Sequence, residues 1–382
     1  MNKQLEKIDE LVRLNNEPSW LEKLRKNALK KWVDNEYYVE ADSPTQKKYT
    51  NFSLDLTNNS SPAVKFESSG NAIVLDFKTA LQQEESLVKK HFQKLLNPEI
   101  SRNAALHFAL FNTGCLIIVP EDVEASVKTS FTGESVLAHS IVITGKNAKL
   151  DYFEDFSSTN ASTSFSEVFI GENSKTDYNF LENASITSQN YSLKKSVLSE
   201  KASFQWIAAS FGSSSTIQEF NSSLEGRNAN SDTYLLFFGK NKQESDLSTN
   251  IRHAVPDTTG NLLAKGILDD EANSVHRGMI LIENPAKNTF SHLMGRALLL
   301  SNKAKANSLP ALEIKTNDVK SRHGASVSHI DKDSVFYLQS RGLKKRDAEL
   351  LIIEGFAQEI IDKSQNPAWR SECEKLLKVR MQ

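Results

Sequence analysis

The feature that most constrains this chain is a short turn pattern that recurs along its middle. It consists of a small or flexible residue, two mostly polar positions, and then Ala or Ser. Clear copies begin at positions 132, 145, 158, 171, 199, 212 and 226, so the spacing is nearly constant except for one interval of double length. That interval fits two steps with one unclear turn near Ile186 to Asn190. Weaker copies begin at Asp269, Glu283 and Ser301.

Between these turns lie short apolar runs such as Leu116–Val119 and Ile141–Thr144, which are typical of strands. When the strand-and-turn step is doubled, its length falls within the roughly 20–50 residues of known structural repeats. The small fourth residue would let the next strand pack closely over the turn. The pattern therefore predicts a mainly β chain with a solenoid core. A β-sandwich or barrel with evenly spaced hairpins is the alternative fold.

Helical patterns flank this core, as a solenoid requires because its end coils need covering. We expect residues 1–100 to form a mostly helical region, residues 101–330 the β-helix core, and residues 331–382 a second helical region. Within the first region, Thr79 to Leu96 is predicted to form one helix that ends at Asn97-Pro98.

Composition and motifs exclude several classes of protein. The formal net charge of −2 gives no electrostatic reason to expect binding to nucleic acid. No apolar run approaches the roughly 20 residues that cross a bilayer, and the N-terminus lacks the pattern of a signal peptide, so we expect a cytoplasmic protein. No phosphate-binding GxxxxGK[ST] motif occurs. Cys115 and Cys373 cannot supply the four thiolates of an ordinary iron–sulfur site.

A series of ordered blocks, covering about residues 100–360, resembles the SufB/SufD family of iron–sulfur cluster assembly scaffolds. The segment DVKSRHGASV resembles the family's DDVKCSHGATV, and FYLQSRGL resembles its FYLxSRGL. A weak similarity also occurs at Lys48–Thr50. The blocks are Ala105–Phe111, Gly114–Pro120, Ile251–Thr259, Lys265–Leu268, Gly278–Ile282, Leu298–Ser301, Pro310–Ile314, Asp318–Val327 and Phe336–Leu343.

The resemblance implies a right-handed parallel β-helix that serves as a scaffold and is not an enzyme alone. It implies pairing with a SufB-type sister subunit, and docking of the SufC-type ABC ATPase on the C-terminal helical region. The cargo would be an Fe–S cluster or iron, held transiently at the partner interface, and this chain would bind no nucleotide.

Departures from the family pattern favour the SufD type over the SufB type. Ser321 replaces the family's cysteine in the KCSHGA block, and Arg322 replaces its serine. The essential cysteine of SufB-type chains falls close to Gly295-Arg296, where this chain has none. The SufB-type His-Glu pair is His323-Gly324 here.

His323 is therefore the candidate metal and cluster ligand, because a neutral imidazole can bind iron or a nascent cluster. The resemblance places this histidine at the sister-chain interface, where a SufB cysteine would be the complementary ligand. The alternative is a structural histidine at the end of the solenoid.

Other residues with possible chemistry have simpler interpretations. His253 and Asp257 lie in a family block that is typical of a tight turn. His292 lies three residues from Gly295, so it could approach the interface, and a structural role is the favoured alternative. His276 and His329 belong to no pattern.

The two cysteines and one acidic cluster also have simple interpretations. We interpret Cys115 as an inert core thiol and Cys373 as an incidental surface residue. In the acidic cluster, strand alternation puts Asp151 and Asp155 on one face and Glu154 on the other, and a solvated strand face is favoured over paired catalytic carboxylates.

Two other functions remain open. A secreted-type carbohydrate-active β-helix enzyme rests on the repeat alone, and fold does not imply function. A self-associating homodimer is the other alternative, because exposed terminal strands can pair around a two-fold axis.

Overall fold

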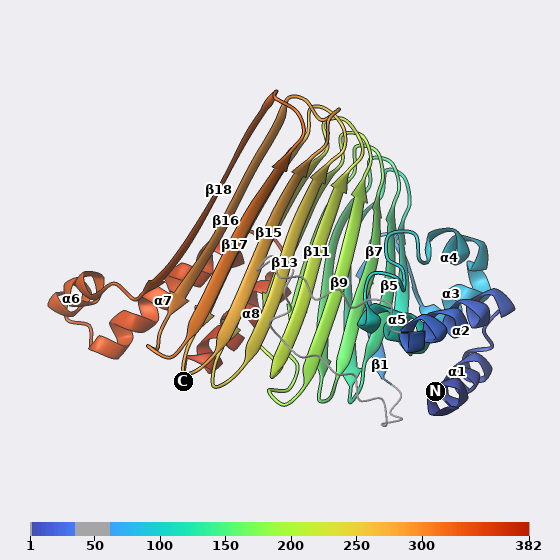
Figure 1. Cartoon of the computed structure of the whole chain (residues 1–382), viewed down its shortest axis with the longest axis horizontal. Coiled ribbons are helices and arrows are strands. Elements are labelled where there is room, and N and C mark those ends of the chain that lie inside the picture. Colours follow the sequence, from blue (N-terminus) through green and yellow to red (C-terminus); the bar gives the residue numbers. More distant parts are fainter. Residues whose placement is uncertain (1, 35–61, 382) are drawn as a thin grey trace.

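The structure is a computed structural model that describes residues 2–34 and 62–381. The similarity at Lys48–Thr50 lies outside these residues. Within the described residues, two sheets of nine strands each face one another, and the chain alternates between them along most of its length (Figure 1). The chain is thus a β-solenoid with helices at both ends, as the turn pattern predicted.

The first sheet, sheet A, contains the even-numbered strands from β4 onward and β1. Its strands, in spatial order, are β1 (Ala63–Ser69), β4 (Glu124–Gly133), β6 (Lys149–Ser158), β8 (Lys175–Glu182), β10 (Ser203–Ser210), β12 (Asn230–Gly239), β14 (Thr259–Leu268), β16 (Thr289–Leu299) and β18 (Val319–His329).

The second sheet, sheet B, contains the odd-numbered strands from β3 onward and β2. Its strands, in spatial order, are β17 (Lys305–Ile314), β15 (Asn273–Ile282), β13 (Glu244–His253), β11 (Ser215–Leu224), β9 (Gln189–Leu198), β7 (Ser162–Ile170), β5 (Leu137–Thr144), β3 (Thr113–Val119) and β2 (Ile73–Asp76).

Neighbouring strands from β3 and β4 onward are parallel, and one coil contributes one strand to each sheet. The register gives the coil length directly. Glu124 pairs with Lys149 near the start, whereas Asn273 pairs with Lys305 near the end, so the later coils are longer. Among the strands that the structure describes, only β1 and β2 run antiparallel to their neighbours, and both lie at the start of the solenoid.

The turns have the chemistry that the repeat requires. Their third residues include Asn147, Asn173 and Asn228, with φ between 56° and 58°, a left-handed conformation that asparagine tolerates well. The Asn173 side chain donates to Asn147 Oδ1 at 2.8 Å, linking one coil to the next. Each following small residue, such as Ala148, points inward and is buried. The unclear step lies in the turn between β8 and β9, where all turn residues keep negative φ.

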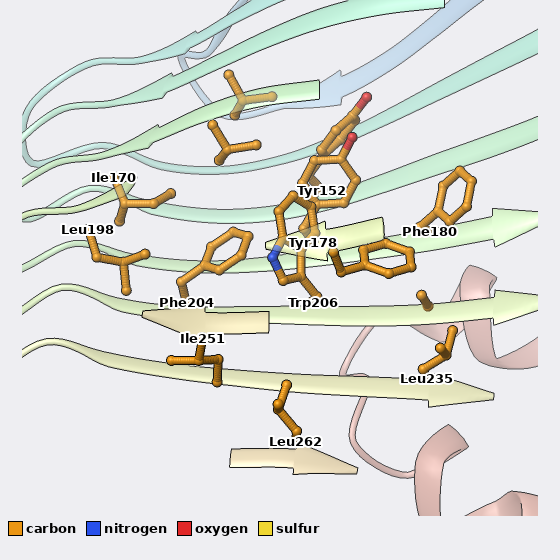
Figure 2. Close-up of a cluster of buried hydrophobic side chains, with 14 of the residues drawn as sticks. Tyr152, Ile170, Tyr178, Phe180, Leu198, Phe204, Trp206, Leu235, Ile251 and Leu262 are labelled. Carbon is orange, nitrogen blue, oxygen red and sulfur yellow. The ribbon is translucent and has the colours of Figure 1, made fainter. Parts of the chain in front are cut away.

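Aromatic side chains stack between the sheets in the middle coils. Tyr152, Tyr178 and Trp206 come from β6, β8 and β10, with successive ring centroids 4.5 and 4.7 Å apart (Figure 2). They belong to a continuous apolar core that runs through the lumen, the space enclosed by the two sheets. Because each coil repeats the same inward alternation, this core extends along the solenoid rather than forming one compact centre.

The N-terminal helices pack on the outer face of sheet B around a second apolar core. They are α1 (Asn2–Asn15), α2 (Ser19–Asp34), α3 (Phe77–Gln83), α4 (Glu85–His91) and α5 (Arg102–Leu110). The single helix expected over Thr79 to Leu96 is wrong, because the chain breaks at Glu84 and leaves the helix after His91. The buried Glu167 carboxylate accepts hydrogen bonds from the amides of Gln93, Leu95 and Leu96, which therefore do not continue a helix.

The C-terminal helices are α6 (Lys332–Ser340), α7 (Lys345–Ile361) and α8 (Pro367–Arg380). Helices α7 and α8 pack on the outer face of sheet A around a third apolar core. Trp369 anchors α8 by donating to the carbonyl of Phe180 at 3.0 Å. Helix α6 stands away from the strands (Figure 1). In the parts of the chain described, every helix is too short or too polar to cross a bilayer.

Candidate functional site

His323 lies on β18, the last strand of sheet A. It pairs with Leu293, which is buried in the lumen, so its side chain lies on the lumenal face of the sheet. In the described residues no strand follows β18, and His323 is exposed at the mouth of the lumen. No hydrogen bond to another described residue holds its imidazole. The ring is therefore free to bind a ligand that approaches from outside the chain.

A metal bound at His323 would need ligands from another molecule. Among residues 2–34 and 62–381, no three His, Cys, Asp or Glu side chains are grouped so that they could hold a metal ion. One imidazole cannot complete the coordination of iron or of a cluster. If a metal binds there, His323 would be one ligand among several.

The end of the solenoid that carries His323 is open. Strands β17 and β18 are the terminal strands of the two sheets, and each has one edge without a neighbour in the described chain. Apolar side chains are exposed there, including Val327 on β18, which is 43% exposed. Unpaired strand edges template pairing with another chain, so this end has the properties of an interface. At the opposite end, β1 and β2 run antiparallel to their neighbours, and α1 to α5 pack on the adjoining outer face of sheet B (Figure 1).

Behind His323, the lumen contains polar groups that the sequence patterns did not single out. Buried Ser321 Oγ, Ser308 Oγ and His276 Nδ1 have no hydrogen-bond partner within the described structure. His276 Nε2 lies 2.9 Å from Thr249 Oγ1, and burial, helped by Arg277, lowers the pKa of His276 to about 4. Strand alternation with a known coil length would have placed His276 inward, but the coil register was not predictable from sequence.

Gly295 also faces this part of the lumen. A Cβ atom at Gly295 would lie 2.2 Å from Ser308 Oγ and 3.2 Å from His276 Nδ1. A side chain at the position close to the SufB-type cysteine would therefore require Ser308 to move. His292, three residues earlier, lies on the opposite, outer face of sheet A, so it does not join Gly295 and His323.

The contacts of His253 and Asp257 are those of structural residues. His253 Nδ1 lies 2.8 Å from Thr258 Oγ1 and its Nε2 lies 2.7 Å from Ser291 Oγ, while burial lowers the pKa of His253 to about 4. Asp257 is in a turn with φ of 63° and pairs with Arg227 at 2.6 Å. His329, at the end of β18, contacts the carbonyl of Leu299 at 3.2 Å.

A buried ion pair lies in the middle of the lumen. Lys194 Nζ from β9 lies 2.9 Å from Glu154 Oε1 on β6, and both side chains are fully buried. The ammonium also donates to Ser164 and Ser166. Burial lowers the pKa of Lys194, and the Glu154 carboxylate opposes this change. The expectation of a solvated strand face is thus wrong for Glu154, which sequence alternation had correctly separated from Asp151 and Asp155.

Asp151 and Asp155 lie on the outer face of sheet A, where partial burial raises the pKa of each carboxyl. Asp151 accepts from the Asn366 side chain at 2.8 Å and so helps hold α8. The surface placement expected for Cys373 is wrong, because Cys373 packs in the core under α8. Cys115 is buried in the lumen, and burial raises the pKa of its thiol to about 12.

The C-terminal helices form a second feature with the properties of a binding surface. A cleft of about 710 Å³ lies between α6, α7 and the ends of the last strands, lined in part by Leu299, Val335 and Leu350. Helix α6 exposes Phe336 and Tyr337, which are 73% and 57% exposed. Large aromatic side chains with this exposure are typical of surfaces that bind other proteins.

Comparison with known proteins supports an assembly role. Residues 126–356 match the family model described as SUF system FeS cluster assembly, SufBD core domain. The iron–sulfur cluster assembly protein SufD of Bacillus subtilis (strain 168) is 27% identical over 399 residues, covering 91% of this chain and 90% of that protein. A SufBD family protein of Staphylococcus saprophyticus is 24% identical over 321 residues, covering 81% of this chain and 69% of that relative.

Proposed function

Because this chain belongs to the SufB/SufD family of iron–sulfur cluster assembly proteins, we propose that it is a SufD-type scaffold subunit that pairs through the open end of its solenoid with a SufB-type chain. The observation that carries the proposal is the exposed, unpartnered His323 on β18, one of the two terminal strands at this end of the described solenoid. In this proposal the cargo, iron or a nascent cluster, is held between His323 and a thiolate of the sister chain.

The division of ligands explains why this chain has no cysteine at the site. Ser321 and Gly295 replace or lie close to the positions of family cysteines, and both lie on the lumenal face with His323. This chain then supplies one neutral nitrogen ligand and a surface that excludes bulk water, while the partner supplies sulfur ligands. Such a subunit performs no catalysis alone.

The C-terminal helices are the proposed docking site for a SufC-type ATPase. Helix α6 stands away from the solenoid and exposes Phe336 and Tyr337, whereas α7 and α8 are fixed to sheet A. ATP binding would then influence the cluster site only if the ATPase binds this helical region differently in its two nucleotide states. Replacing Phe336 with Ala is expected to reduce co-purification of the ATPase without affecting pairing with the sister chain.

The direct test is co-expression with SufB- and SufC-type proteins, followed by anaerobic iron and sulfide analysis of the purified complex. We expect His323→Ala to lower iron and sulfide content without preventing assembly. His329→Ala, which removes another exposed histidine of β18, is the matched control and should load normally. If both variants load normally, this chain is a structural partner only. Failure to form any complex would contradict the scaffold proposal.

A homodimer is a second possibility, because the same open strands could pair with a second copy around a two-fold axis. Mass measurement of the chain with and without the sister subunit separates the two assemblies. A dimer that persists in the presence of the sister chain would favour the homodimer.

A further inference from the structure

The outer face of the last two strands of sheet A is rich in cations. Lys320 and Arg322 project from β18, and the opposing positions on β16 are Phe290 and His292. Arg296 follows on the same face of β16. Lys320, Arg322, Arg296 and Phe290 are exposed, and His292 is partly exposed. These five residues are called the basic face below. His323 lies next to Arg322 in sequence but on the opposite, lumenal side of β18.

The positive charge of the basic face is largely uncompensated. In the described chain, no carboxylate lies within ion-pair distance of Lys320 or Arg322, and Arg296 has only Glu359 of α7 at 3.6 Å, a carboxylate that also binds Lys265. The far end of the same outer face differs, because Lys149 pairs with Glu124 at 3.1 Å and Lys175 lies 3.8 Å from Asp177. The pKa of His292 is lowered, first by burial and then by Arg322 and Arg296.

An apolar surface accompanies these charges. Phe290 is 45% exposed, and the Lys320 ammonium lies 5.3 Å from the centre of its ring. Met294 lies on the same face between His292 and Arg296 and is partly exposed. A surface of this kind can bind carboxylates and an apolar side chain of one ligand together. A simple inorganic anion would interact only with the positive charges of this surface and not with its apolar side chains.

We infer that the basic face binds an acidic, extended polypeptide segment of a partner protein. Residues two apart in a strand are about 6.5–7 Å apart, so Lys320 and Arg322 match alternate side chains of an extended peptide. Three permanent cations are too few to bind nucleic acid strongly at physiological salt, where binding proteins typically neutralise about 6–10 phosphates. The basic face also adjoins the open end, so a partner seated there could extend a segment across it.

The experiment measures binding of a fluorescein-labelled ten-residue peptide of alternating Glu and Ala to the full chain, by fluorescence anisotropy. The test variant is Lys320→Glu/Arg322→Glu. The matched control is Lys149→Glu/Lys175→Glu, two exposed lysines on the outer face at the other end of the same sheet. We expect the test variant to bind about tenfold more weakly and the control to stay within about twofold of the unmodified chain. Raising the salt from 50 to 300 mM should weaken binding by the unmodified chain.

Two further variants serve as checks. The first tests whether charge repulsion or misfolding explains the loss of binding, and the second separates peptide binding from cluster binding. Lys320→Met/Arg322→Met removes the charges without adding repulsion and should also weaken peptide binding. His323→Ala should leave peptide binding unchanged, even where it lowers iron content. The inference is overturned if the unmodified chain does not bind the peptide, if the test and control charge reversals weaken binding equally, or if a ten-nucleotide oligo(dT) binds as tightly as the peptide.

Discussion

At the scale of single residues, the lumen of this solenoid buries histidines and an ion pair. His253 and His276 lie in the lumen, and burial lowers the pKa of each to about 4. The Lys194–Glu154 pair lies deeper in the same lumen, with both side chains fully buried. Such groups stabilise the fold only in one protonation state or with their partner present. Each therefore makes a measurable contribution to stability.

The buried histidines predict loss of stability in acid. The folded pKa of His276, about 4, lies below the unfolded value of about 6.5, so the unfolded chain takes up the proton first as pH falls. Stability is therefore lost from about pH 6.5 down to about pH 4 and regained as pH rises. We expect His276→Gln to lose about 3 kcal/mol less unfolding free energy than the unmodified chain between pH 7 and pH 4. The measurement is urea unfolding at both pH values, with His329→Gln as the control. Equal changes in unfolding free energy between pH 7 and pH 4 for the two variants would contradict the prediction.

The buried ion pair predicts a non-additive mutational effect. Lys194→Met leaves the Glu154 carboxylate buried without its cation, and we expect a loss of about 3–5 kcal/mol of unfolding free energy. Lys194→Met/Glu154→Gln should recover most of that loss, because no charge then remains at this point of the lumen. Urea unfolding of the two variants decides the point. Equal destabilisation of both would mean that the ion pair does not govern stability here.

At the scale of elements, local signals were sufficient where the structure depends on local chemistry. The turns at residues 145–148 and 171–174 were predictable because Asn147 and Asn173 adopt left-handed backbone and a small residue follows each. The end of the helix that begins near Thr79 was not predictable. The amides of Gln93 and Leu95 donate to the carboxylate of Glu167, which is distant in the sequence, and so they do not continue the helix. Cys373 was misplaced for a similar reason, since only the docking of α8 on sheet A buries it.

The candidate site was predictable only in part. The family resemblance identified His323 as a candidate ligand. Its exposure depends on β18 being the last strand of sheet A, and that position could not be predicted from the sequence. His276 and the Lys194–Glu154 pair were missed because the coils differ in length from one end of the solenoid to the other, so inward neighbours cannot be counted by a fixed step.

The Glu167 contact gives a prediction for the N-terminal helices. Glu167→Ala removes a carboxylate that accepts from three backbone amides, and each such charged hydrogen bond contributes about 1.5–3 kcal/mol. We expect faster amide hydrogen exchange in residues 92–96 with little change in the distant coils. Glu172→Ala, which removes an exposed carboxylate just beyond β7, is the control and should leave that segment protected. Uniform faster exchange throughout the chain would contradict a local role.

At the scale of the whole molecule, the two ends of the solenoid differ in the direction of their last strands and in what packs beside them. At the start, β1 and β2 turn antiparallel and α1 to α5 cover sheet B, which closes the repeat. At the other end, β17 and β18 keep the parallel direction of the repeat, and His323 is exposed on β18. In the proposed assembly only this end receives the sister chain, because a solenoid that continued at both ends would grow into a filament.

The most direct test of this account is the mass of the complex formed with the SufB- and SufC-type proteins, measured by light scattering after gel filtration. The test variant is Val327→Lys, on β18. The control is Ile73→Lys, which changes an apolar residue of β2 at the opposite end of the solenoid with a closely similar exposure, 41% against 43%. We expect that Val327→Lys prevents pairing with the sister chain, while Ile73→Lys assembles normally. Normal assembly of Val327→Lys, or loss of assembly only in Ile73→Lys, would contradict it.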